Sequence, residues 1–197
     1  MPRRGTAIRL FLTGWILYCA HFSSNVVRES YLAIALGGDL SVRVDRYLGL
    51  HPDLFEIPGR GAYINSNPGA SIFGAVPYAV ARPFLDVLYR LRPGLVEPKP
   101  AARYDDPRPN RTRFMNEARA RGLDIELGLA AAVMQVGFMA PASALMMVLM
   151  YYYLSARLGD ERRAVWLSVL YGFGTPIFFR PAFLNQKLML AHLVLVA

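Results

Sequence analysis

The residues best suited to chemistry lie in one polar stretch, Arg28 to Gly69, between two apolar segments. Its candidate carboxylates are Glu29, Asp45 and Asp53. A carboxylate can take the proton of an attacking hydroxyl or amine, and carboxylate oxygens also hold hard cations such as Mg²⁺ or Mn²⁺. Because Glu29 follows the first apolar run almost directly, we predict that it is a catalytic base at a membrane surface.

The other candidates are assigned by their charge. We predict that Asp45 and Asp53 bind substrate, and that Asp53 also holds a divalent cation, Mg or Mn. Arg180 and Lys187 follow a later apolar segment and are candidates for phosphate contacts, because a departing phosphate needs positive charge beside it. The alternative for each of these residues is a solvated charge in a loop.

The composition favours a membrane protein. Hydrophobic residues make up 54% of the 197 residues, and the mean hydropathy is +0.27, both above the usual values for soluble domains. The net charge is +8, but the arginines lie at the ends of apolar runs and in one mixed polar segment, not in a stripe interleaved with aromatics. We therefore expect membrane lipids as partners, and no nucleic acid.

Apolar runs at about 10–27, 127–154, 164–182 and 188–197 predict membrane-spanning helices. A span needs about 20 residues, so the last run is truncated, and we expect the chain to be the N-terminal part of a single longer membrane domain. The predicted fold is an all-α integral membrane protein. It would be a polytopic helix bundle with a large, partly helical extracytoplasmic first loop, 28–126.

The segment 70–91 is long enough to span, but it contains Arg82 and Asp86 as well as Pro77 and Pro83. A charge at the bilayer centre costs about 2.5–3.5 kcal/mol, and we expect Pro83 to break a helix. We therefore predict a juxtamembrane helix on the outer surface. If the segment spans instead, the orientation of everything after it is reversed.

Three features resemble the start of the GT-C membrane glycosyltransferases, which include protein O-mannosyltransferases and aminoarabinose transferases. Glu29 matches the second member of an Asp-Glu pair that often follows the first helix in relatives. The stretch 61–69, GAYINSNPG, resembles Gly-x-Tyr-Tyr-Ser-x-Lys/His-x-Pro-Gly, and 171–176, YGFGTP, resembles a Gly-Thr-Pro element. Arg28 replaces the first acid of the pair, and Asn67 stands in a stretch that lacks the basic residue.

The resemblance implies transfer of a sugar from a polyprenyl-phosphate-linked donor to an unidentified acceptor on the extracytoplasmic side. It implies a multi-pass protein of the plasma membrane, the inner membrane in a bacterium. The alternative is a polytopic transporter or lipid flippase, which would carry charges inside its spans, whereas 10–27 and 127–154 carry none. A membrane scaffold without chemistry is a third possibility.

Overall fold

The computed structural model describes residues 3–23, 28–101 and 103–196 and is 72% helical. The chain forms two compact units. Unit 1 comprises Met1–Ser23 and Met134–Ala197, and unit 2 comprises Ser24–Val133.

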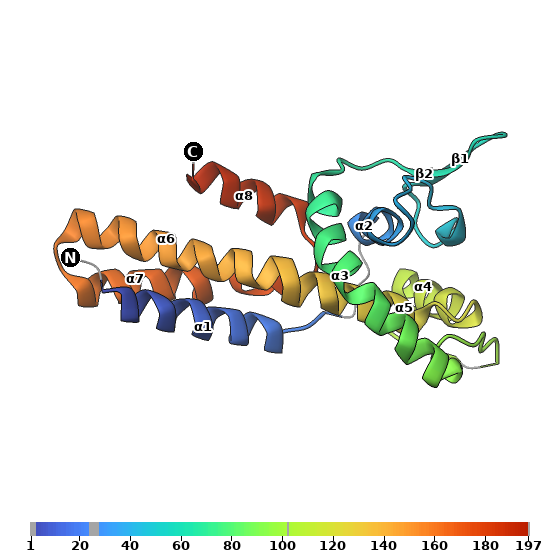
Figure 1. Ribbon diagram of the computed structural model, residues 1–197, viewed down its shortest axis with the longest axis horizontal. Helices are drawn as coiled ribbons and strands as arrows, with labels where there is room; N and C mark the ends of the chain where they lie inside the picture. Colours follow the sequence, from blue (N-terminus) through green and yellow to red (C-terminus); the bar gives the residue numbers. More distant parts are fainter. Residues whose placement is uncertain (1–2, 24–27, 102, 197) are drawn as a thin grey trace. The chain divides into compact units, whose positions relative to one another are not determined.

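Unit 1 is a set of helices arranged around α6. Its elements are α1 (Arg4–Ala20), the π-helical turn η3 (Gln135–Met139), α6 (Ala140–Leu158), α7 (Glu161–Phe173), the 3₁₀ segment η4 (Pro176–Ala182) and α8 (Gln186–Val196). The helices α1 and α7 both pack against α6 (Figure 1). Small residues permit this close packing, because Met147 lies against both Gly14 and Gly172.

The end of α1 is held by a buried glutamine. The last carbonyl groups of a helix have no partner within it. The side-chain amide of Gln135 donates to the carbonyl oxygens of Tyr18, at 2.7 Å, and His21, at 3.0 Å. The hydroxyl of Tyr18 in turn donates to the carbonyl of Gly172, at 3.0 Å, which ties α1 to α7.

Unit 2 contains the polar stretch in which we predicted the chemistry. Its elements are α2 (Arg28–Asp39), the 3₁₀ turn η1 (Asp45–Tyr47), β1 (Leu54–Ile57), β2 (Gly61–Ile64), α3 (Gly69–Leu91), the 3₁₀ turn η2 (Pro93–Leu95), α4 (Pro109–Ala120) and the start of α5 (Asp124–Met134). The two strands form an antiparallel hairpin in which Leu54 pairs with Ile64. The helices α2 and α3 pack side by side (Figure 1).

The helix α3 has two different faces. One face carries large exposed apolar side chains along its whole length: Ile72, Phe73, Val76, Val80, Phe84, Val87 and Leu91. The other face carries polar side chains at helical spacing: Tyr78, Arg82, Asp86 and Tyr89. The helix runs unbroken through both of its prolines, so the expected break at Pro83 is wrong.

The predicted polytopic membrane bundle is wrong, although the all-α class is confirmed. Among the described residues, only the helices Gly69–Leu91 and Asp124–Leu158 are long and apolar enough to cross a membrane. The helix in 10–27 ends at Ala20, and residues 24–27 lie outside the described part.

The expected span at 164–182 is short for a physical reason. The run 164–182 is interrupted where α7 ends at Phe173, because Gly174 and Pro176 follow and the Thr175 hydroxyl accepts from the N–H of Ile177. The helix in the last run, α8, has only 11 residues.

The expected first loop, 28–126, corresponds closely to unit 2, Ser24–Val133.

Close approach of α2 and α3 depends on Gly37. A Cβ atom placed there would lie 2.5 Å from the carbonyl oxygen of Ala75, a backbone atom that cannot move alone. We expect Gly37→Ala to lower the free energy of unfolding by about 1–3 kcal/mol, the usual range for overpacking. The matched control is Gly128→Ala on α5, where a Cβ atom would meet nothing within 4 Å. Equal stability of the two variants in denaturant unfolding would contradict this account of the α2–α3 contact.

Candidate functional site

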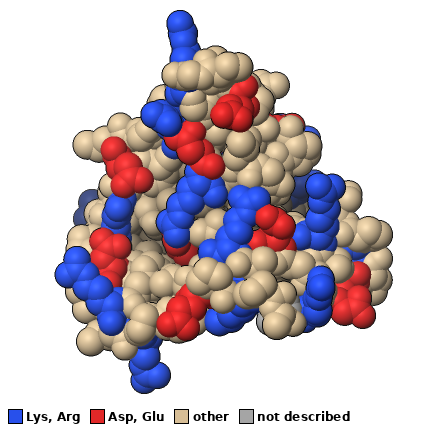
Figure 2. Space-filling view, turned by 90° about the vertical axis from the view of Figure 1, so that its right-hand side faces the viewer, with Lys and Arg blue, Asp and Glu red and all other residues tan. Residues whose placement is uncertain are grey.

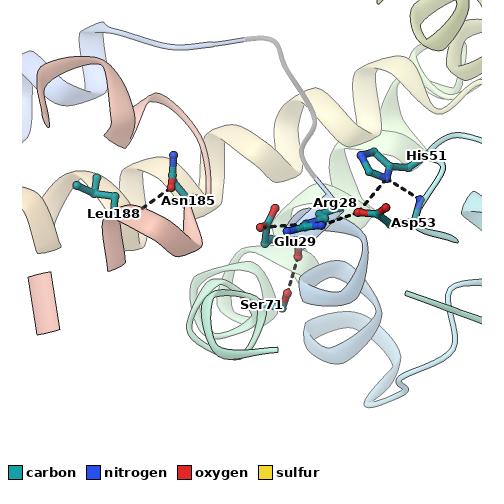
Figure 3. Close-up of polar contacts among 7 residues, drawn as sticks. All are labelled: Arg28, Glu29, His51, Asp53, Ser71, Asn185 and Leu188. Atoms are coloured by element: carbon teal, nitrogen blue, oxygen red, sulfur yellow. Dashed lines mark hydrogen bonds and ion pairs between the residues drawn. The ribbon is translucent and has the colours of Figure 1, made fainter. Parts of the chain in front are cut away.

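The first turn of α2 places Glu29 in a chain of charged groups (Figure 3). Glu29 is only 8% exposed. The guanidinium of Arg28 lies between two carboxylates, with Nε 3.5 Å from Oε1 of Glu29 and Nη1 2.6 Å from Oδ2 of Asp53. A carboxylate in the first turn of a helix is also stabilised by the positive end of the helix dipole. Glu29, the predicted base, and Asp53, the predicted ligand, thus contact the same Arg28 guanidinium.

Two further contacts fix this cluster. The backbone N–H of Asp53 donates to Nδ1 of His51 at 3.1 Å, so this nitrogen carries no proton when it accepts that bond. The hydroxyl of Ser71, fully buried on α3, donates to the backbone carbonyl of Glu29 at 2.8 Å (Figure 3). The position of Glu29 therefore depends on the packing of α2 against α3.

The electrostatics of the cluster keep Asp53 ionised. The hydrogen bond from Arg28 is the main reason that the pKa of the Asp53 carboxyl lies below its ordinary value of 3.8. The same guanidinium offsets the negative charge by which Asp53 would attract a metal ion. In the described part of the chain, no group of three or more His, Cys, Asp or Glu side chains is placed to hold a metal ion. Binding of Mg or Mn by Asp53 stays a prediction.

Asp45 has a different environment. It accepts the backbone N–H of Ala62 at 2.5 Å and pairs with Arg43 at 2.7 Å. The hydrogen bond from Ala62 is the first cause of its lowered pKa, and the charge of Arg43 acts in the same direction. These contacts tie η1 to strand β2, which gives Asp45 a structural role.

The two predicted phosphate contacts belong to unit 1. Arg180 is exposed on η4, and Lys187 is exposed in the first turn of α8. The start of α8 is capped by Asn185, whose side-chain oxygen accepts the N–H of Leu188 at 3.0 Å (Figure 3). Glu29, Asp45 and Asp53 lie in unit 2, so phosphate binding by Arg180 and Lys187 remains a prediction.

Sequence reasoning missed an ion pair of unit 2 whose carboxylate is buried. Glu126, at the start of α5, is 6% exposed, and both of its oxygens accept from Arg46, at 2.7 and 2.6 Å. Burial alone would lower the pKa of Arg46, but the charge and hydrogen bonds of Glu126 outweigh it and raise that pKa. This two-pronged geometry is the strong form of a carboxylate–arginine contact.

The pair lies in a pocket of about 600 Å³ within unit 2. The pocket lies next to three tyrosines, Tyr47, Tyr78 and Tyr89, and to residues of α2 and the polar face of α3. The signal for it was present in the sequence, since Tyr78, Arg82, Asp86 and Tyr89 recur at i, i+4, i+8 and i+11 within an otherwise apolar segment. Of the two charged members, Arg82 keeps 35% and Asp86 keeps 50% of its side-chain surface exposed.

A scan against protein-family models and searches of curated proteins and of solved structures found no match to this chain. The resemblance to the GT-C glycosyltransferases therefore remains a hypothesis. The roles of individual residues are therefore inferred from distances, burial and contacts within each unit.

The lowered pKa of Asp53 has a consequence for acid stability. Its ion pair stabilises the fold fully above about pH 3.8, and this contribution is lost as the pH falls through the lower pKa of the folded state. Between pH 5 and pH 3, we expect the melting temperature of the Asp53→Asn variant to decrease less than that of the parent. The exposed Asp105→Asn variant is the control and should behave as the parent does. An identical acid-induced loss in Asp53→Asn and the parent would contradict the pairing with Arg28.

Proposed function

We propose that this protein is a membrane-associated glycosyltransferase that moves a sugar from a polyprenyl-phosphate-linked donor to an acceptor hydroxyl or amine. The observation that carries the proposal is the two-sided α2–α3 pair. One side is an apolar surface along the whole of α3, and the other holds Glu29 and a polar pocket lined by both helices. A lipid-linked substrate needs both surfaces, because its chain stays in lipid while its sugar must reach polar groups.

The membrane part of the proposal is supported by α3 itself. A helix of 23 residues is about 34 Å long at 1.5 Å per residue, close to the roughly 30 Å of a bilayer core. Its exposed face is apolar up to Arg90 in the last turn, whereas Arg82 turns toward α2 and contacts Asp39 at 2.9 Å. The proposed location is the plasma membrane, with the reaction on its extracytoplasmic side.

The proposed chemistry uses Glu29 as the base. The acceptor oxygen or nitrogen attacks C1 of the sugar while its proton passes to the Glu29 carboxylate. The bond between C1 and the phosphate oxygen breaks, and the polyprenyl phosphate leaves with the bonding electron pair. Arg28, 3.5 Å from Glu29, supplies a neighbouring positive charge for the departing phosphate. General base catalysis of this kind contributes about 10²–10⁴-fold in rate.

The alternative function is transport or flipping of a lipid-linked anion. It is favoured by Arg82 and Asp86, which lie on a helix long enough to span a membrane. Charges inside a span typically mark a pathway for a polar substrate. A transporter would move the lipid-linked sugar across the bilayer and leave its glycosyl–phosphate bond intact.

The Glu29→Gln variant tests the proposal, because glutamine keeps the shape of the side chain but does not accept the proton. In proteoliposomes with a polyprenyl-phosphate sugar donor, we expect transfer to fall about 10²–10⁴-fold while the amount of protein inserted is unchanged. The control is Glu56→Gln on β1, where the side chain is exposed. Transfer by Glu29→Gln at the parent rate would exclude Glu29 as the base, and sugar translocation without any transfer would favour the alternative function.

A further inference from the structure

We propose that one end of unit 1 binds the phosphate headgroups of anionic phospholipids. This end is made by the start of α1, the last two turns of α6 and the start of α7, residues 3–6 and 151–166, and we call it the basic end. The inference goes beyond the proposed function, because it names a class of lipid and the surface that binds it, and it does not depend on sugar transfer.

A single carboxylate joins the three segments of the basic end. Glu161, in the first turn of α7, accepts from the Thr6 hydroxyl of α1 at 2.9 Å and from the Tyr151 hydroxyl of α6 at 3.0 Å. Its second oxygen lies 3.2 Å from Nε of Arg3. The Tyr151 hydroxyl also accepts the backbone N–H of Arg3 at 2.9 Å. The three segments therefore form one surface within unit 1.

The positive charge of the chain is concentrated in unit 1. Eight basic and two acidic residues give unit 1 a charge of +6 out of the total +8, whereas unit 2, with 14 basic and 12 acidic residues, is nearly neutral. Basic and acidic side chains lie next to one another over the face shown in Figure 2. The basic end differs, because it holds five arginines and two acidic residues: Arg3, Arg4, Arg157, Arg162 and Arg163, with Asp160 and Glu161.

Both acidic residues of the basic end already have partners, but two of its arginines do not. Glu161 is held by the contacts above, and Asp160 pairs with the guanidinium of Arg163 at 3.1 Å. Arg4 and Arg162 are exposed, and neither side chain makes an ion pair or a hydrogen bond with another residue that the structure describes. An unpaired guanidinium can contact a phosphate through two parallel N–H groups.

The side chains beside the arginines are those of a membrane interface. Tyr153 and Trp166 are 58% and 65% exposed, and tyrosine and tryptophan are enriched at the level of lipid headgroups. The guanidinium of Arg157 lies 5.5 Å from the ring centre of Tyr153. The candidate membrane helix Asp124–Leu158 also ends here. Farther along α1 and α7, large apolar side chains are exposed: Ile8, Leu12, Leu167 and Leu170.

A depression in the basic end is large enough for a headgroup. Its volume is about 590 Å³, and its lining includes Arg3 and Arg162 beside Val165 and Trp166. A phospholipid offers a phosphate to the arginines and apolar chains to the neighbouring surface. A nucleic acid would match the charge but would leave the apolar side chains of α1 and α7 uncovered. The combination of spare positive charge, exposed aromatic rings and adjoining apolar surface therefore favours an anionic lipid.

The two tryptophans of the chain make this proposal measurable. In a Trp15→Phe background, Trp166 is the only tryptophan, and brominated lipids that lie beside it quench its fluorescence. The full chain would be placed in bilayers of phosphatidylglycerol and phosphatidylcholine, with bromine on one lipid or the other. We expect phosphatidylglycerol to be preferred beside Trp166. Arg162→Gln should lower its relative binding constant about fivefold, the usual effect of one arginine near an anionic surface.

Two controls separate a local site from general attraction. Arg60→Gln removes the same charge from the turn between β1 and β2 in unit 2 and should leave the preference unchanged. In a Trp166→Phe background, Trp15 becomes the reporter. It lies about 16 Å along α1 from Arg4 and should detect no preference. Equal quenching by the two brominated lipids at Trp166 would overturn the proposal, and so would equal binding constants for Arg162→Gln and its parent.

Native mass spectrometry of the chain with both tryptophans is the second measurement. From micelles that contain both lipids, we expect more bound phosphatidylglycerol than phosphatidylcholine, and less of the excess in Arg162→Gln. Displacement of phosphatidylglycerol by an RNA oligonucleotide at the same salt concentration would assign the basic end to nucleic acid and overturn the proposal. Neither measurement needs a sugar donor or turnover, so its result is independent of the outcome with Glu29→Gln.

Discussion

The ion pair between Arg46 and Glu126 is the interaction on which the arrangement of unit 2 depends. It joins η1 to the start of α5 across 80 residues of sequence, with both carboxylate oxygens accepting from the guanidinium. The Glu126 carboxylate is almost removed from water, whereas the Arg46 side chain is 59% exposed. The two partners therefore contribute unequally. A buried carboxylate that loses its cation keeps the full cost of desolvation, but a half-exposed guanidinium can turn to solvent.

The rest of unit 2 is arranged around this contact. The tyrosines Tyr47, Tyr78 and Tyr89 line the same pocket as Glu126, so the polar face of α3 has an interior surface to meet. Once that face is fixed, the apolar face of α3 points outward and remains uncovered within unit 2. The same packing holds the first turn of α2 through the bond from Ser71 to the backbone of Glu29. The site and the candidate membrane surface are thus two consequences of one helix orientation.

Much of the local structure could be predicted from the sequence. Apolar runs indicate helices, and the helix at 70–91 was placed to within one residue of its start, Gly69. Helix lengths were less predictable, because composition does not show where a cap or a turn ends a helix. The helix α7 ends at Phe173, and the Thr175 hydroxyl caps the 3₁₀ segment that follows; this shortening is one reason that the predicted bundle of spans is wrong. The site was predictable in part. Glu29 and Asp53 were both predicted as site residues, and both contact Arg28. Glu126 was assigned to a polar loop, because its partner Arg46 lies 80 residues away in the sequence.

The most direct test of this account is a double-mutant cycle on the central ion pair, measured as the free energy of unfolding of the full chain in detergent micelles. We expect Arg46→Gln to cost about 2–3 kcal/mol because it leaves the buried Glu126 charge unpaired. Glu126→Gln should cost less, because Arg46 is partly solvated, and the double variant should cost about as much as Glu126→Gln alone. Single costs that simply add in the double variant would show that the two side chains are not coupled and would contradict the account.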